Sequence, residues 1–423
     1  MSAVAVELVE EPIEARAAPE DAVGGGFGWL WTAETISLAG SAVTTVALPA
    51  LAVLRLGAGP VEVGLLAAAV RLPYPFLGLI AGVIADRLPR RAVMVTCDLA
   101  RVLVLGSIPV ADAAGLLSVP MLIVIAALSG VFGVFFDIAN LALVPSLVGR
   151  RGLVRAYGWL EVTNATSNLV GPGLGGLLVQ LAGAARAVAA DAASFLASAV
   201  LLLRIRPRAT EHDHCEGPRP SPLADLREGV RFVLREPVLR ALLLSQGLLV
   251  LGAHAIDAPL LLFAYRDLGF SPGTVGLVLT IAGVGSMLGA VASRRLKRWA
   301  PGRVTILSSF TVGVCLLALP LAAVAPPLVV LPGLLAIDAA VGTVGNVAQV
   351  TLRQSLTPTA LQGRMNAFFR VVYWGAWPLA NLLGGLLAAV TGPLPAIAIA
   401  GAVCVVSAGV GALTPLRVAR LLL

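Results

Sequence analysis

The sequence predicts an all-α integral membrane protein with twelve transmembrane helices, arranged as two six-helix bundles related by a pseudo-twofold axis. Three observations support this fold class. Of the 423 residues, 58% are hydrophobic and only 13% are charged, with a mean hydropathy of +0.94, whereas a soluble globular domain carries roughly 25% charged residues. Apolar runs long enough to cross a bilayer recur along the whole chain. Finally, the two halves of the chain repeat short motifs at a constant offset.

The apolar runs define the individual spans. A transmembrane helix needs about 20 mostly apolar residues. The short segment "APP" leaves open whether the ninth and tenth runs are two helices or one. We place the spans at 27–54, 61–84, 92–111, 116–144, 155–181, 185–205, 238–263, 272–293, 303–324, 327–351, 364–390 and 393–414.

These spans divide the chain into five regions. We expect a disordered cytoplasmic N-terminal arm (1–26), an N-terminal bundle (27–205), a cytoplasmic linker (206–236), a C-terminal bundle (237–416) and a cytoplasmic tail (417–423). In the linker, apolar residues recur at helical spacing from Leu223 to Leu234 with arginines opposite, which predicts an amphipathic helix at the membrane surface. The neighbouring His212, His214 and Cys215 could bind a metal, but no fourth ligand lies nearby, so a solvated linker is the favoured interpretation.

The distribution of arginine and lysine predicts the orientation. With the N-terminus inside, the inner loops and the tail hold nearly all of the loop arginines, whereas the outer loops hold only Arg55, Arg186 and Arg266. Cytoplasmic loops of membrane proteins carry such an excess of positive charge. Both termini should therefore be cytoplasmic, in the plasma membrane of a bacterium. The net charge of +7 then reflects topology, and we expect no nucleic-acid partner.

Short motifs recur with an offset of 209 residues. "LGGLL" at Leu174–Leu178 returns at Leu383–Leu387, "PSL" at Pro145 aligns with "QSL" at Gln354, and Arg155 aligns with Arg364. Apolar sequence can produce one such match by chance, but several matches in the same register indicate an internal repeat. In transporters built from such repeats, the substrate site lies between the halves near the membrane midplane.

The loop "GVIADRLPRR", Gly82–Arg91, places an acid and three arginines between the second and third spans. Arginines there act as topology anchors, but the acid needs another explanation. The pattern Gly-x-x-x-Asp-Arg-x-x-Arg-Arg resembles the loop signature of the major facilitator superfamily, with Pro89 where that family usually has glycine. The resemblance implies that Asp86, with Arg87, Arg90 and Arg91, latches the cytoplasmic ends of the bundles in the outward-open state, near Gly363–Asn366.

A second motif supports the same resemblance. "SNLVGPGLGG" in the fifth span is similar to the antiporter signature of that superfamily, which marks exporters that exchange substrate with protons; Ser167 replaces the first glycine. Glycines let helices approach closely and proline permits a bend, so a packing role is also expected. The residues that match the signature are Gly171, Pro172, Gly175 and Gly176.

The resemblance covers most of the chain. "FFDIANLALVPSLV" and "LQGRMNAFF" resemble the branch that includes the enterobactin exporter and the macrolide efflux proteins. The span-four arginine motif of classical drug antiporters is not visible in "LSGVFGVFFDIANLALVP", which argues against the usual route of proton coupling.

Ionisable residues inside spans are costly and usually face a cavity or a partner. Glu34 has no basic neighbour in sequence and is the first candidate for the proton-coupling group, unless it simply hydrates near the surface. His254 and Asp257, at i and i+3, are the second candidate, or else a buried polar pair. Asp98 and Arg101 have the same spacing and are interpreted as a structural pair. Polar faces and aromatic walls give the cavity candidates Arg71, Asp137, Asn140, Asn168, Asp338, Asn346, Trp374 and Trp377.

These features predict a secondary exporter of a bulky, mostly apolar small molecule, driven by proton antiport through alternating access. A siderophore or sugar exporter is the alternative transport function, and a non-transporting membrane sensor is an alternative of another class. An enzyme is not expected, because the sequence has no nucleophile elbow, phosphate loop or metal set. We expect no cofactor and no metal, a monomer in the lipid bilayer, and protons and a small-molecule substrate as partners.

Overall fold

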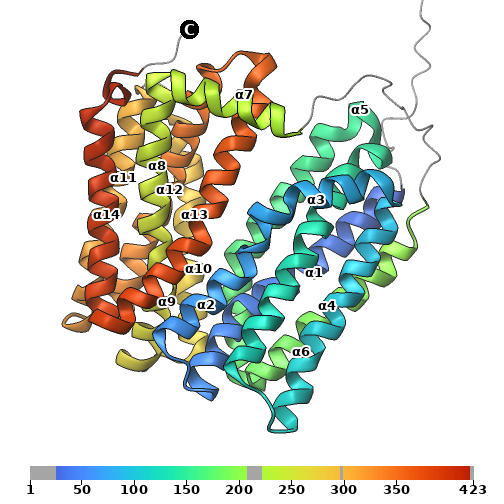
Figure 1. Ribbon diagram of the computed structural model, residues 1–423. Helices are drawn as coiled ribbons and strands as arrows, with labels where there is room; N and C mark the ends of the chain where they lie inside the picture. Colours follow the sequence, from blue (N-terminus) through green and yellow to red (C-terminus); the bar gives the residue numbers. More distant parts are fainter. Residues whose placement is uncertain (1–24, 207–221, 296–298, 420–423) are drawn as a thin grey trace, which may run out of the picture.

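The computed structural model describes residues 25–206, 222–295 and 299–419, and every regular element in these ranges is a helix. The helices form two bundles that lie side by side (Figure 1). The predicted all-α, two-bundle fold class is confirmed. Residues 1–24 of the predicted N-terminal arm, His212, His214, Cys215 and the end of the tail lie outside the described residues.

The first bundle, here called the N half, contains the helices that precede the linker. Their bounds are α1 (Gly25–Ala50), the π-helix η1 (Leu51–Arg55), α2 (Pro60–Arg71), α3 (Pro73–Arg87), α4 (Arg90–Ala113), α5 (Val119–Ala182) and α6 (Ala184–Leu203).

The second bundle, here called the C half, follows helix α7 (Pro222–Arg235). Its elements are α8 (Pro237–Ala255), α9 (Asp257–Leu262), the π-helix η2 (Phe263–Asp267), α10 (Pro272–Ser293), α11 (Pro301–Ala318), η4 (Leu319–Ala323), α12 (Pro327–Ser355), η5 (Thr359–Leu361), α13 (Gln362–Thr391), α14 (Pro393–Leu413) and η6 (Pro415–Val418). The ninth and tenth spans are separate helices, since η4 ends at Ala323 and α12 begins at Pro327.

The fourth and fifth spans differ from the expectation. The sequence predicts two helices separated by a loop at 145–154, but α5 runs through both spans for 64 residues and is interrupted only at Gly149 (φ 64°, ψ 176°). Glycine alone adopts this backbone conformation without strain, so one residue replaces the loop. Eleven helical segments of the described chain are long and apolar enough to cross a membrane. The second part of α5, whose first turns are polar, is the twelfth helix of the arrangement.

Proline breaks two spans that the sequence predicts as continuous. The second span is divided at Leu72, before Pro73, and the seventh is divided at Ile256, three residues before Pro259. Proline lacks a backbone N–H and leaves a carbonyl of the preceding turn without its helical partner. Both breaks lie beside polar side chains that face the space between the halves, as described below.

Helix α7 covers the segment for which the sequence predicts an amphipathic helix. Its apolar face packs on the C half, where Val233 is completely buried against Leu239, Met365 and Phe369. Glu228 of α7 also forms an ion pair with Arg364 at the start of α13. That α7 lies along a membrane surface stays a prediction. We call this side of the molecule the α7 end and the opposite side the far end.

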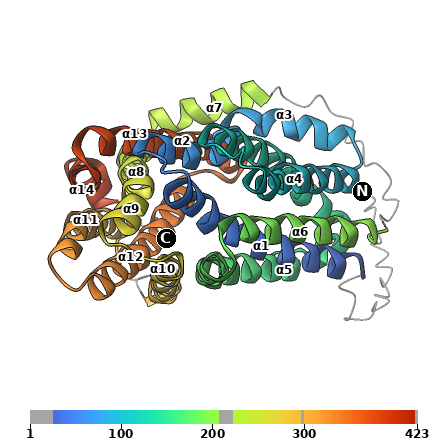
Figure 2. The ribbon, with the colours of Figure 1, turned by 90° about the horizontal axis from the view of Figure 1, so that it is seen from below.

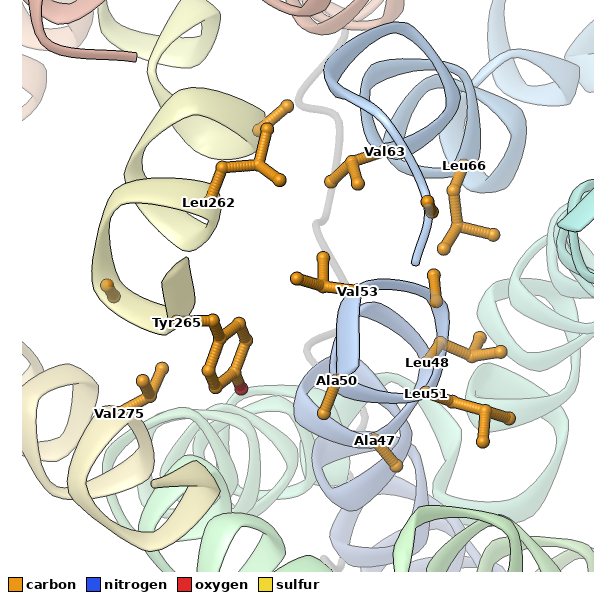
Figure 3. Packing of buried hydrophobic residues seen from close by; sticks show 14 of the residues in the cluster. Ala47, Leu48, Ala50, Leu51, Val53, Val63, Leu66, Leu262, Tyr265 and Val275 are labelled. Carbon is orange, nitrogen blue, oxygen red and sulfur yellow. The ribbon is translucent and has the colours of Figure 1, made fainter. Parts of the chain in front are cut away.

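The two halves are sealed together at the far end. Helix α2 lies beside α13 and α10 lies beside α5 (Figure 2). A buried hydrophobic cluster, here called the far-end cluster, continues from one half into the other. Val53 of η1 and Val63 of α2 face Leu262 and Tyr265 of the C half, whereas Leu51 points to the other side of η1 (Figure 3).

Polar contacts complete this seal. The Arg266 guanidinium donates to the carbonyl oxygens of Gly57 (3.0 Å) and Ala58 (2.7 Å), and the Ser271 hydroxyl donates to Gln180 (3.2 Å). Each contact joins a residue of one half to a residue of the other. The far end is therefore closed by apolar packing together with specific hydrogen bonds between the halves.

Candidate substrate cavity

A cavity of about 1960 Å³ lies between the two halves. Its walls come from α1 to α6 of the N half and from α9, α10 and α13 of the C half. It extends from Val275 beside the far-end cluster to Tyr157, Ala360 and Gly363, which are exposed at the α7 end. The cavity is therefore closed at the far end and open toward α7. Pockets for drug-sized ligands typically measure about 300–1,000 Å³, so this cavity has room for a bulky molecule.

Glu34 of α1 faces this cavity. The amide nitrogen of Asn140, on α5, donates to both carboxylate oxygens of Glu34 at 3.1 Å. One amide satisfies only part of the hydrogen-bonding capacity of a carboxylate. The sequence analysis singled out Glu34 and Asn140 independently of each other. In the structure the two side chains are hydrogen-bonded.

Asp137, one turn before Asn140 on α5, also lines the cavity. The Tyr74 hydroxyl donates to its carboxylate at 2.9 Å. Tyr74 lies directly after Pro73, where the second span is broken. The sequence analysis did not single out Tyr74, since a tyrosine in an apolar span carries no charge signal.

Behind this wall, Asp98 and Arg101 of α4 form the predicted pair, with 3.9 Å between Nη1 and Oδ1. Asp98 is completely buried. The Arg101 guanidinium also packs over the rings of Phe136 (5.4 Å) and Phe195 (4.8 Å) and lines the cavity. That Asp98 and Arg101 act as a structural pair remains a prediction. The Arg101 side chain both packs against aromatic rings and reaches the cavity.

Asp191 of α6 is a cavity residue that the sequence analysis missed. It is 1% exposed and accepts hydrogen bonds from the hydroxyls of Thr44 and Ser194. The rule that singled out Glu34, an acid inside an apolar span, applies equally to Asp191 in "AVAADAASF" and would have found it.

In the C half, a group of polar side chains lies at the break in the seventh span. His254 and Asp257 flank the break, and His254 Nδ1 lies 3.6 Å from Asp257 Oδ2. With its amide orientation assigned from the surrounding acceptors, the buried Asn381 of α13 donates to the His254 carbonyl and to Asp257, both at 2.9 Å. Asn381 thus holds a backbone carbonyl at the break. Asp257 and Asn381 line the cavity, whereas His254 lies behind them.

Aromatic side chains of α13 meet the N half along one wall. Trp374 contacts Tyr74 with ring centroids 5.0 Å apart, and the guanidinium of Arg71 lies 4.6 Å from the ring centroid of Trp377. All four side chains line the cavity. Asn168 lines another part of the cavity wall, on α5, and its amide nitrogen donates to the Asn164 side-chain oxygen at 3.0 Å.

That α12 supplies cavity residues stays a prediction. Asp338 and Asn346 are not among the lining residues. Helix α12 packs behind α10, with Gly285 and Gly289 of α10 directly against its backbone. Asn346 instead accepts a hydrogen bond from Gln349 (2.9 Å). In this arrangement the polar stripe of α12 therefore does not line the cavity.

The glycines of the antiporter-like motif pack on two partners. Gly171 and Gly175 lie against α1, where a Cβ on Gly175 would be 2.8 Å from the Val43 Cα. Pro172 and Gly176 lie against Gly276 of α10, and a Cβ on Gly176 would be 3.0 Å from the Gly276 Cα. The motif therefore joins α5 both to its own bundle and to the other half.

The predicted latch is only partly described. The Asp86 side chain lies outside the described residues. Arg90 donates to the Ala142 carbonyl, and Arg91 donates to the carbonyls of Leu203 and Ile205, all at 2.8 Å. Both arginines thus bond backbone carbonyls of their own half, and Arg87 is exposed. The latch itself stays a prediction about the outward-open state.

Among the described residues, no group of three or more His, Cys, Asp or Glu side chains could hold a metal ion. A chain of two helical bundles, with a large central cavity closed at one end and lined by charged groups, has the architecture of a membrane transporter.

Comparison with known proteins shows the family to which this transporter belongs. The profile of the family described as "Transmembrane secretion effector" matches residues 23–421, and the chain belongs to this family of the major facilitator superfamily. It is a multi-pass bacterial membrane transporter and not an enzyme.

Two relatives illustrate the family. The chain is 31% identical to the multidrug efflux pump Tap of Mycolicibacterium fortuitum over 364 residues, which cover 84% of this chain and 87% of that protein. It is 30% identical to the enterobactin exporter EntS of Salmonella typhimurium over 324 residues, covering 74% and 72%.

Solved structures agree on the fold. The nucleoside transporter NupG (D323A mutant) matches with a TM-score of 0.75 at 12% identity, covering 92% of this chain and 99% of that one. A bacterial homologue of the lysosomal transporter Spinster, inward-facing and occupied, matches with a TM-score of 0.71 at 13% identity, covering 92% and 95%. At such low identity these likenesses show the fold alone.

Proposed function

We propose that this protein exports a bulky, mostly apolar small molecule across the plasma membrane in exchange for protons. The observation that supports the proposal most strongly is the large cavity between two repeated halves, closed at the far end and open at the α7 end. Alternating access requires such a central cavity, which opens to one side at a time. Relatives named as efflux and export proteins support the outward direction.

The wall of the cavity fits a large amphiphilic substrate better than a small polar one. Apolar and aromatic side chains supply most of it, with a few charged groups at intervals. A siderophore is the second candidate, because one relative is named as an enterobactin exporter. The Arg71, Arg364 and Arg370 side chains in the lining would suit an acidic substrate of that kind.

The orientation is part of the proposal. Loop arginines gather at the α7 end, so we infer that this end faces the cytoplasm. Reporter fusions after Arg91, within 206–222 and at the C-terminus should therefore all report a cytoplasmic location. A fusion after Gly115, in the loop between α4 and α5, should report the outside. A linker fusion that reports the outside would contradict the arrangement of two bundles joined in the cytoplasm.

The function is tested with purified protein in liposomes. We expect rhodamine 6G to be moved against its gradient only when a pH gradient is imposed, with the membrane potential clamped by valinomycin and potassium. An uncoupler should abolish the accumulation. Transport that persists unchanged after the pH gradient has collapsed would eliminate proton antiport, and accumulation of an acidic siderophore in place of the dye would favour the second candidate.

A further inference from the structure

Helix α7 carries three arginines on the face that points away from the C half. Arg227, Arg231 and Arg235 are spaced four residues apart, and all three are exposed. With about 100° of turn and about 1.5 Å of rise per residue, they lie within an arc of about 80° and along about 12 Å of the helix. The buried residues Gly229 and Val233 lie on the opposite side of the helix. We call the three arginines the arginine face of α7.

No ion pair neutralises the arginine face within the part of the chain that the structure describes. Glu228, the one acid among the described side chains of α7, is already paired with Arg364 of α13. Glu236, which follows directly after the helix, can offset only one of the three charges. Exposed guanidiniums this close together favour an anionic partner that offers several acceptor oxygens.

The contacts of α7 with α13 give the arginine face a defined position. A Cβ on Gly229 would lie only 2.5 Å from the Arg364 carbonyl oxygen, so the two helices touch through their backbones there. Val233 packs on Met365 and Phe369. These three contacts of α13 all belong to its first turns, and α7 therefore lies level with the start of that helix.

The start of α13 lies at the depth of the lipid headgroups. Its 30 residues make a helix about 45 Å long, whereas the hydrocarbon core of a bilayer is about 30 Å thick. Seen from below, α7 lies at the outer edge of the molecule (Figure 2). Its arginine face, directed away from α13, therefore points toward the surrounding lipid. Leu234, which is 48% exposed and three residues after Arg231, offers an apolar contact beside the charges.

We propose that the arginine face of α7 binds the headgroups of anionic phospholipids. Guanidiniums bind phosphate oxygens through paired hydrogen bonds, and basic side chains near a membrane surface attract acidic lipids. Because α7 is packed on the first turns of α13, a bound headgroup would hold the start of α13 at the membrane surface. Binding at this face depends on neither the transported substrate nor the coupling ion.

Native mass spectrometry of the purified full chain in detergent tests this binding. Dioleoylphosphatidylglycerol and dioleoylphosphatidylcholine have the same acyl chains, so only their headgroups are compared. We expect the first phosphatidylglycerol to bind about tenfold more tightly than the first phosphatidylcholine. Replacing Arg227, Arg231 and Arg235 together by glutamine should reduce this preference to about twofold or less, with phosphatidylcholine binding unchanged. Replacing the same three by lysine should retain most of it, since lysine keeps the charge.

The matched control replaces Arg294, Arg295 and Arg303 by glutamine. It removes the same number of charges from exposed positions of the same half, and it should keep the preference within about twofold of the wild type. Millimolar glycerol 3-phosphate should not displace the lipid. A preference that survives in the glutamine variant of the arginine face, an equal loss in the control, or displacement by the soluble phosphate would each overturn the proposal.

A single substitution keeps the test decisive if the triple variant does not fold. Arg231→Gln removes only the middle charge, at an exposed position, and should lower the preference for phosphatidylglycerol about two- to threefold. An unchanged preference in Arg231→Gln would count against binding at the arginine face.

Discussion

Replacing Gly385 by alanine should reduce export about tenfold or more, whereas Gly375→Ala, ten residues earlier on the same helix, should leave export near the wild-type rate. Gly385 of α13 meets Gly64 of α2 where the halves close at the far end. A Cβ on Gly385 would lie 2.6 Å from the Pro60 carbonyl oxygen and 3.1 Å from the Gly64 Cα. At Gly375 the nearest atom to an added Cβ is the Pro75 Cβ at 3.9 Å, an ordinary contact.

The expected loss follows from the atoms involved. Both close contacts at Gly385 are backbone atoms of the other half, so no side chain can move aside. Overpacking of this kind typically costs about 1–3 kcal/mol, and about 1.4 kcal/mol changes an equilibrium tenfold. Alanine is also a better helix former than glycine, so a less stable helix α13 cannot explain a loss of export. The cost applies only while the far end is closed, and it therefore shifts the protein toward the arrangement that is open there.

Thiol labelling measures this shift directly. Val53, 4% exposed within the far-end cluster, is replaced by cysteine in a Cys215→Ser background. An impermeant maleimide added from the far side should label Val53→Cys faster when Gly385→Ala is also present, and no faster with Gly375→Ala. Equal labelling and normal export in Gly385→Ala would show that the halves do not close through this contact.

The fold could be predicted from the sequence because each of its signals is local or periodic. Apolar runs of about twenty residues predict spans one at a time, and the offset of 209 residues relates "LGGLL" in α5 to "LGGLL" in α13. The breaks at Leu72 and Ile256 were not predicted, and at Gly149 a single residue stands where a loop was predicted. Glycine and proline occur throughout these spans, and only packing against neighbouring helices determines which of them interrupts a helix.

The candidate site was predicted as a set of residues but not as a geometry. Glu34, Asn140 and Asp257 stood out because polar groups are costly inside spans. Asp338 and Asn346 were singled out by the same rule, yet neither lines the cavity in this arrangement. The rule identifies a polar face and cannot tell whether that face meets the cavity or another helix of the same bundle.

Contacts between the halves were the least accessible to sequence reasoning. Arg71 and Trp377 are more than 300 positions apart in the chain, and nothing local relates them. Asn381 looks like an isolated amide in an apolar span, although it holds the break beside His254. Such pairings depend on how one bundle sits against the other.

Glu34→Gln should abolish accumulation of substrate against its gradient while leaving substrate binding and downhill equilibration in place. Glutamine has the shape of a protonated glutamate, and its carbonyl oxygen can still accept from Asn140, which lies 3.1 Å from both carboxylate oxygens. What the variant loses is the ability to alternate between a charged and a neutral state. A membrane carboxylate suits a proton carrier because protonation removes the charge that is costly in an apolar environment.

The accumulation ratio in liposomes measures this loss. If one proton is exchanged per substrate, a gradient of one pH unit sustains about a tenfold ratio. We expect the wild type to approach that value with rhodamine 6G, and Glu34→Gln to reach a ratio of about 1. Glu161→Gln is the matched control, since Glu161 is an exposed glutamate in the wall of the same cavity and should leave the ratio near that of the wild type.

The accumulation ratio also shows which half of the protein carries the proton. Glu34 is the first candidate because its described contacts are with an amide and no cation pairs with it among them, so nothing holds it permanently charged. Asp257 is the second, because it lies between the cavity and His254. If Glu34→Gln accumulates substrate normally and Asp257→Asn does not, the proton is carried in the C half beside the broken seventh span. In that case the Glu34–Asn140 contact is a packing interaction.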